Sequence, residues 1–210
     1  MKLTVLTYMA WGASVTVMLA AAVILLSSVL GMGLALTRLY AWPPLRVLAA
    51  GYALITRGIP LLVLLIGCYF SLPYLGVTLP VYAAAIVVMG FYFAAYMGEV
   101  FRGALMAVPR TQWDAGRSVG FRSLQNFGIV ILPQARRLCV APFLNTSLSV
   151  VKNTSLISAI GGWELFSTGR EIGERTGELM PAYLGVAAGY YLICFPLARL
   201  ASYVERHSHA

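Results

Sequence analysis

The sequence predicts an all-α integral membrane protein whose chain crosses the bilayer five times. Hydrophobic residues make up 60% of the chain and charged residues only 10%, a composition typical of membrane proteins. Two long stretches, residues 4–37 and 58–98, contain no charged side chain at all. Each is longer than the roughly 20 apolar residues that a helix needs to cross a bilayer. We expect residues 1–210 to form a single transmembrane domain.

Hydrophobic segments and the turn signals between them place the five spans. The second uncharged stretch contributes to two spans, because the Pro- and Gly-marked segment Ser71–Pro80 predicts a turn within it. The fourth span is long enough only if Pro133 lies in its first helical turn. The expected spans cover about residues 8–36, 48–70, 80–101, 133–151 and 181–203.

Basic residues are concentrated on one side of these spans. Loop 38–57 carries three of them, loop 102–137 carries six and the C-terminal tail carries two, against four on the other side. Because basic loops stay in the cytoplasm, this bias predicts that the N-terminus is outside and the C-terminus inside. The net charge of +8 is therefore attributed to membrane orientation and not to nucleic-acid binding.

The loop between the third and fourth spans, residues 102–132, is too long for a simple turn. Pro109 interrupts the preceding helix. Thr111 and Asp114 have the spacing of a capping box, with Thr111 as the N-cap residue, and Gly120 is a natural C-terminal stop. The pattern predicts a short helix of roughly nine residues.

Two interpretations of this short helix are open. It is either a helix that lies on the membrane surface or a docking helix for a cytoplasmic protein. Ala115 and Gly116 form a small-residue patch that another backbone could approach. Trp113 is expected to be an exposed aromatic anchor of the kind that fills a partner's pocket.

These residues resemble the cytoplasmic EAA loop of importer permeases in the ATP-binding cassette superfamily. The closest pattern is that of the polar amino acid family, which includes histidine, glutamine, arginine and glutamate/aspartate permeases. The family's E-A-A reads Asp114–Gly116 here, and its G-Q reads Thr111-Gln112. Matches run in family order from Arg57 onward and comprise Arg57–Leu62, Glu99, Arg102, Gly103, Val108, Pro109, Gln112, Asp114, Ala115, Gly120, Leu132–Ala135, Asn145 and Lys152–Leu156.

The resemblance implies two groups of residues outside the solute path. The group that would couple the chain to an ATPase is Gly103, Pro109, Thr111, Gln112, Trp113, Asp114, Ala115, Gly116 and Gly120. The group with structural or gating roles is Arg57, Pro60, Glu99, Arg102 and Pro133. Arg57 is either an anchor at the membrane interface or a substrate contact, and Glu99 and Arg102, three apart, are expected to pair.

The same resemblance implies the partners. The sequence has no P-loop, so any ATP hydrolysis must take place on a separate chain, which would bind the ATP and Mg²⁺. The chain itself is expected to be no enzyme and to bind no cofactor or metal; its cysteines lack ligand spacing, and His207 and His209 are interpreted as solvated tail residues. The expected complex has two permeases (copies or homologues), two ATPases and an extracytoplasmic solute-binding protein, in a bacterial inner membrane.

Candidate residues for the solute path lie in and after the fourth span. They are Asn145, Ser149, Lys152, Thr154, Ser155 and Glu164. The residues from Lys152 to Ser155 would either meet an amino acid carboxylate or cap the helix, and Glu164 would face an amino group or form a gate contact. The segment Ile172–Gly177 is similar to glutamate/aspartate permeases, which suggests an acidic substrate. The alternative function is a secondary transporter or channel, although inverted repeats and intramembrane acids are not visible.

Overall fold

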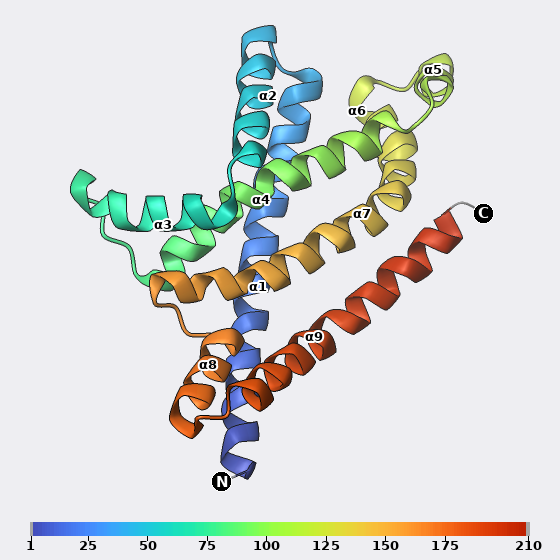
Figure 1. Cartoon of the computed structure of the whole chain (residues 1–210). Helices are drawn as coiled ribbons and strands as arrows, with labels where there is room; N and C mark the ends of the chain where they lie inside the picture. The colour runs from blue at the N-terminus through green and yellow to red at the C-terminus, as the bar shows by residue number, and fades with distance from the viewer. Residues whose placement is uncertain (1, 209–210) are drawn as a thin grey trace.

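The structure, a computed structural model, describes residues 2–208, and the side chains of residues 5–206. This part of the chain is built of helices joined by short segments and contains no β-strand (Figure 1). The helices are α1 (Lys2–Tyr40), α2 (Pro43–Gly58), α3 (Leu61–Ser71), η1 (Leu72–Leu75), α4 (Val81–Met106), α5 (Arg110–Ser118), α6 (Ser123–Asn126), η2 (Phe127–Ile131), α7 (Leu132–Asn153), η3 (Thr154–Ile160), α8 (Leu165–Thr176) and α9 (Leu179–Ser208). The side chains of His207 and His209 lie outside the described residues.

Four of the five expected spans lie within helical runs of the described residues that are long and apolar enough to cross a membrane. The described residues give these four candidates as Val5–Tyr40, Val81–Met106, Ser123–Ile160 and Leu179–Arg206. Pro133 lies in the first turn of α7, as its position in the sequence predicts. A fifth span is obtained only if a bent pair of helices is counted as one crossing.

The second expected span, about residues 48–70, is wrong as a continuous helix. α2 ends at Gly58 and α3 begins at Leu61, with a bend of 102° between them (Figure 1). Proline disfavours the helical conformation of the residue before it, and Ile59 is accordingly extended, with φ −106° and ψ 133°. Pro60 then starts α3 in a new direction as its N-cap residue.

α1 and α4 lie against each other over most of their length, and glycines set how closely they approach. A Cβ on Gly31 would come within 2.7 Å of the Met97 Cβ, and one on Gly98 would come within 2.9 Å of Leu34 Cδ2. Small residues allow this kind of close packing between membrane helices.

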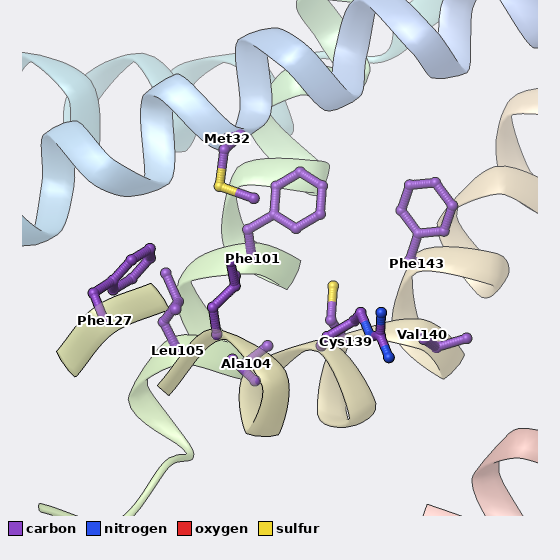
Figure 2. Close-up of a pocket in the computed structure, with 11 residues that line it drawn as sticks. Met32, Phe101, Ala104, Leu105, Phe127, Cys139, Val140 and Phe143 are labelled. Carbon is purple, nitrogen blue, oxygen red and sulfur yellow. The ribbon is translucent and has the colours of Figure 1, made fainter. Parts of the chain in front are cut away.

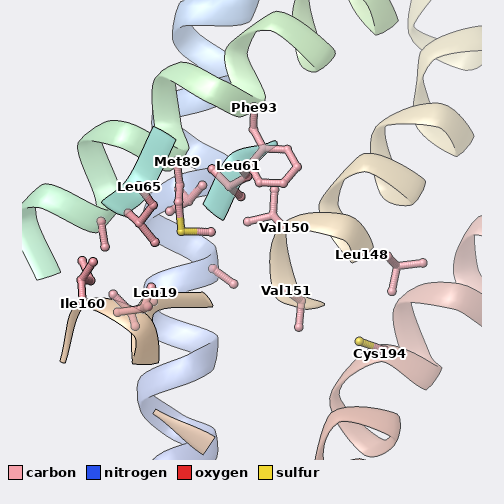
Figure 3. Close-up of a cluster of buried hydrophobic side chains, with 14 residues drawn as sticks. Leu19, Leu61, Leu65, Met89, Phe93, Leu148, Val150, Val151, Ile160 and Cys194 are labelled. Carbon is pink, nitrogen blue, oxygen red and sulfur yellow. The ribbon is translucent and has the colours of Figure 1, made fainter. Parts of the chain in front are cut away.

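The main core lies where α3, α4, α7, α9 and η3 meet α1. Figure 3 shows its buried side chains converging from these helices. It contains Leu19, Ala20, Val23, Leu61, Leu65, Ala85, Met89, Phe93, Leu148, Val150, Val151, Ile157, Ile160 and Cys194. A smaller apolar cluster of Leu105, Val108, Ile131 and Ala135 joins the end of α4 to the start of α7. This second cluster is the base on which α5 rests.

Candidate functional site

α5 is a nine-residue helix beyond the end of α4, as the sequence predicts, but its first turn differs from the expectation. The N-cap residue is Pro109, and the structure shows no side-chain cap hydrogen bond, so the capping box from Thr111 is wrong. Pro109 is itself not helical, with ψ 142°, so the helix begins at Arg110 and Thr111 lies inside its first turn. Gly120 ends the segment as expected: its φ is +83°, and its N–H donates to the Arg117 carbonyl at 2.9 Å.

The expected exposure of Trp113 and Gly116 is not found in this structure. Trp113 is half-buried against the smaller apolar cluster, with its ring centroid 6.5 Å from that of Phe127. Gly116 is buried, and a Cβ there would lie 2.0 Å from Asn126 Oδ1. Asn126 Nδ2 donates to the Trp113 carbonyl at 2.7 Å. These residues therefore attach α5 to its own chain.

The opposite face of α5 is open. Its exposed residues are Arg110, Thr111, Asp114, Ala115, Arg117 and Ser118. Asp114 and Arg117 are both 71% exposed and approach each other only to 4.0 Å. Gln112, on the side of α5, accepts a hydrogen bond of 3.3 Å from Gln134 Nε2 of α7. α5 is thus fixed to α6 and α7 by hydrogen bonds, while a charged face remains available. Gly103, from the expected coupling group, is exposed on α4.

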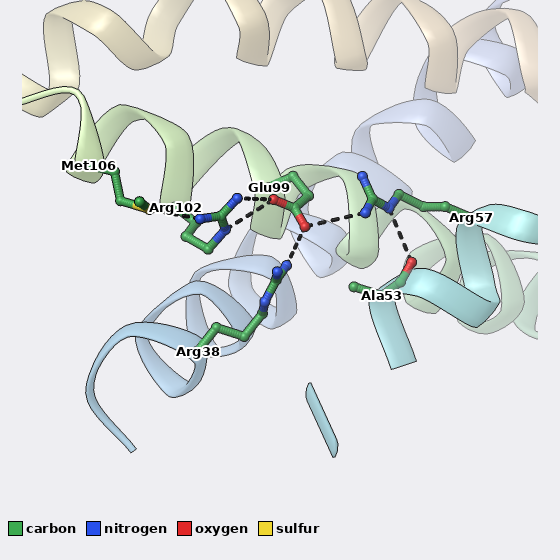
Figure 4. Close-up of polar contacts among 6 residues, drawn as sticks. All are labelled: Arg38, Ala53, Arg57, Glu99, Arg102 and Met106. Atoms are coloured by element: carbon green, nitrogen blue, oxygen red, sulfur yellow. Dashed lines mark hydrogen bonds and ion pairs between the residues drawn. The ribbon is translucent and has the colours of Figure 1, made fainter. Parts of the chain in front are cut away.

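Glu99 on α4 is the centre of an arginine cluster (Figure 4). Arg102 donates to its carboxylate at 2.7 and 3.0 Å, which confirms the expected pair. Arg38 from α1 also contacts the carboxylate, and Arg57 from α2 lies 3.3 Å away. Arg57 Nε donates to the Ala53 carbonyl at 3.1 Å. One carboxylate therefore connects three helices. The contact between Arg38 and Glu99 could not be predicted from their spacing in the sequence.

A polar groove of about 370 Å³ lies between α4 and α7. Its lining is Tyr92, Phe93, Tyr96, Asn145, Thr146, Ser149 and Asn153. Asn145, Ser149 and Asn153 recur every four residues on one face of α7. The hydroxyls of Tyr92 and Tyr96 lie 3.1 Å apart. Two of the predicted path residues are therefore in the groove. Tyr92 and Tyr96 were missed, although polar aromatic residues in an uncharged span were a usable signal.

The other predicted path residues do not line this groove. Thr154 is fully buried and its hydroxyl donates to the Val151 carbonyl at 2.8 Å, while Ser155 donates to the Lys152 carbonyl at 2.9 Å. Both hydroxyls therefore fit the capping alternative. Lys152 itself is exposed at the end of α7.

Glu164 is fully buried, and its carboxylate is used within the chain. It is the N-cap of α8 and accepts from the N–H groups of Phe166 and Ser167, both at 2.9 Å. The Tyr190 hydroxyl donates to it at 2.6 Å. Thr16 of α1 contacts the same carboxylate oxygen at 3.4 Å. In this structure the carboxylate faces its own chain and no open cavity.

A second pocket, of about 200 Å³, has a different character (Figure 2). It lies between α1, α4, η2 and α7, and its labelled side chains are apolar. The lining is Met32, Phe101, Ala104, Leu105, Phe127, Leu132, Ala135, Arg136, Cys139, Val140 and Phe143. Apart from Arg136 it offers no polar side chain, so the groove between α4 and α7 is the better candidate for a polar solute.

Residues 27–209 match the family of inner membrane components of binding-protein-dependent transport systems. The chain belongs to this family. It is therefore a membrane transport component and not an enzyme.

Two relatives and one solved structure show the extent of the similarity. The L-cystine transport system permease protein TcyB of Bacillus subtilis is 36% identical over 187 residues, which cover 87% of this chain and 80% of the relative. The probable glutamine ABC transporter permease protein GlnM of Bacillus subtilis is 32% identical, with 86% and 83% covered. The crystal structure of an amino acid ABC transporter with histidines matches with a TM-score of 0.90 and 26% identity, covering 98% of this chain and 96% of that chain.

Proposed function

We propose that this chain is the membrane subunit of an ATP-driven importer that moves a polar amino acid into the cytoplasm. A second permease, which is a copy or a homologue, would complete the translocation path. Two ATPase subunits would bind ATP and Mg²⁺, and an extracytoplasmic binding protein would deliver the solute. The observation that carries the proposal is α5, whose inner face is fixed to α6 and α7 while its outer face is open and charged.

The proposed orientation puts the N-terminus outside and α5 on the cytoplasmic side of a bacterial inner membrane. Five crossings follow if α2 and α3 together make one broken span. The excess of arginine in loops 38–57 and 102–137 supports this orientation. α5 then projects from the membrane on the side where a cytoplasmic ATPase would be.

The mechanism follows from how α5 is held. ATP binding draws two ATPases together, and each carries the α5 helix that is docked on it. Because Asn126 and Gln134 connect α5 to the segment that leads into α7, a displacement of α5 moves α7 relative to α4. The polar groove lies between these two helices, so their movement changes access to it. The energetic requirement is that the ATP-bound and free ATPases contact α5 differently.

The substrate proposed is a polar amino acid with an uncharged side chain. The lining of the groove contains hydroxyl, amide and aromatic groups and no ionised side chain. A carboxylate side chain would lose its hydration there without gaining a counter-charge. The segment Ile172–Gly177, which suggested glutamate or aspartate, begins at the C-terminal half of α8 and does not line the groove. The two relatives are named for L-cystine and glutamine, whose side chains carry no net charge.

Charge reversal at Asp114 tests the docking surface. Asp114→Arg should abolish co-purification of the ATPase and transport, while the chain still inserts into the membrane. The fold should tolerate the change because Asp114 is 71% exposed and its ion pair with Arg117 is 4.0 Å long. Glu174→Arg is the matched control, since Glu174 is 65% exposed and pairs with Arg170 at 3.8 Å. Normal ATPase co-purification and transport by Asp114→Arg would refute the docking assignment.

The alternative of a secondary transporter or channel is not supported by membership in a binding-protein-dependent family. Purification in mild detergent separates the two functions directly. Mass spectrometry of the purified material should find an ATPase with a P-loop in the same peak as this chain. A homo-oligomer alone would favour the alternative.

A further inference from the structure

A group of arginine side chains gathers where α1, α2 and α4 meet. These arginines line a groove of about 440 Å³, whose lining residues are Arg38, Leu39, Arg46, Val47, Ala50, Arg102 and Met106. Three of these seven residues are arginines, and they come from three different helices. The groove is at the same end of the molecule as α5, because Met106 is the last residue of α4.

The charge in this groove is only partly balanced. Glu99 is the acidic partner that the structure records for Arg38, Arg57 and Arg102. Arg46 is exposed and donates through Nε to the Ala41 carbonyl, and the ion pairs of the described residues include none for it. Three arginines line the groove, and two of them share the carboxylate of Glu99, so a net positive charge remains that favours an anion there.

The surroundings of the groove are apolar. The helix that forms one wall, α2, exposes large hydrophobic side chains, with Val47 71% and Leu54 70% exposed. Trp42, immediately before α2, is 71% exposed. Aromatic residues gather at the level of lipid headgroups, and apolar side chains at the level of acyl chains. The groove therefore combines a cationic site with an apolar wall on one side.

We propose that this groove binds the headgroup of an anionic phospholipid, with the acyl chains against the exposed apolar face of α2. Basic pockets between transmembrane helices at the cytoplasmic side suit lipid phosphates for this reason. Guanidinium groups bind phosphate oxygens through paired hydrogen bonds. A soluble anion would satisfy the arginines but would leave the apolar wall uncovered, so the lipid is the occupant that matches both halves of the surface.

Native mass spectrometry of the full-length chain tests this proposal. The protein is purified in mild detergent and mixed with equal amounts of phosphatidylglycerol and phosphatidylethanolamine. Preferential retention of phosphatidylglycerol is expected. Arg46→Gln should lower that preference about fivefold, the effect of one basic side chain near an anionic membrane surface. The substitution removes an exposed side chain, so the fold should be retained.

Two further variants sharpen the test. Arg46→Lys keeps the positive charge and should restore most of the preference. Arg137→Gln removes an exposed arginine of α7 that does not line the groove, and it should leave the preference unchanged. Equal retention of the two lipids by the unmodified chain would overturn the proposal, as would an equal loss in Arg46→Gln and Arg137→Gln.

The remaining outcomes distinguish other occupants. Inorganic phosphate at millimolar concentration should not displace the bound phosphatidylglycerol; complete displacement would identify a soluble-anion site and overturn the lipid proposal. If Arg46→Gln loses the ATPase but keeps its lipid preference, the groove is a protein contact and the proposal is again overturned. The phosphate competition does not depend on whether α5 docks an ATPase, because its readout is lipid retention.

Discussion

Replacing Glu164 with alanine tests whether this carboxylate supports the fold or meets the solute. Alanine removes the acceptor for the N–H groups of Phe166 and Ser167 and for the hydroxyl of Tyr190. Loss of an N-cap costs about 1 kcal/mol, and a buried donor that loses a charged acceptor costs about 1.5–3 kcal/mol. The free energy of unfolding should therefore fall by about 3 kcal/mol, since Glu164 is fully buried.

The assay is chemical unfolding of the purified protein in mixed micelles, monitored by circular dichroism. Two milder variants rank the contributions. Tyr190→Phe removes only the 2.6 Å hydrogen bond and should cost about 1–2 kcal/mol. Glu164→Gln keeps the shape but provides one acceptor oxygen in place of two, so its loss should fall between those of Tyr190→Phe and Glu164→Ala.

The decisive comparison is between stability and transport in Glu164→Gln. If the carboxylate is structural, transport should decline only as far as the amount of folded protein declines. A variant that is as stable as the unmodified chain and assembles normally, but no longer transports, would refute the structural assignment. Unchanged unfolding of Glu164→Ala would refute the hydrogen-bond argument itself.

Two other substitutions test the site with matched controls. Gly116→Leu should displace α5 and weaken ATPase co-purification, because even a Cβ would lie 2.0 Å from Asn126 Oδ1. The control Gly33→Leu should leave co-purification unchanged, because a Cβ on Gly33 meets nothing within 4 Å. Equal co-purification by the two variants would contradict the packing argument. Ser149→Leu should fill the polar groove and reduce the transport rate without loss of stability. Ser202→Leu replaces a similarly exposed serine with the same i−4 hydrogen bond, and it should transport normally; equal rates in both variants would exclude the groove as the path.

Local sequence determined the ends of several elements because their causes lie within a few residues. Pro109 has no N–H to continue the preceding helix and Gly120 adopts a left-handed φ, so both ends of α5 follow from properties of single residue types. The same local rule explains why the Thr111 cap was wrong: Pro109 already started the helix. The break at Pro60 was available in the sequence too, but the apolar run on either side of it favoured one continuous span.

The direction of side chains was decided only by the tertiary structure. Trp113 and Gly116 have the composition of a contact surface, yet they face Phe127 and Asn126, which the chain brings back by a turn after α5. Glutamate is also an uncommon N-cap residue. The role of Glu164 therefore became visible only with Tyr190 beside it.

The sequence by itself predicted four of the long apolar helices and the short polar helix between two of them. Each of these follows from composition or from spacing along one segment. The tertiary structure decided which distant groups meet: Arg38 with Glu99, 61 residues apart, and Thr16 with Glu164, 148 apart. The physical reason is that helices are local structures, whereas their packing depends on shape and charge over the whole chain, and only packing forms a groove between α4 and α7.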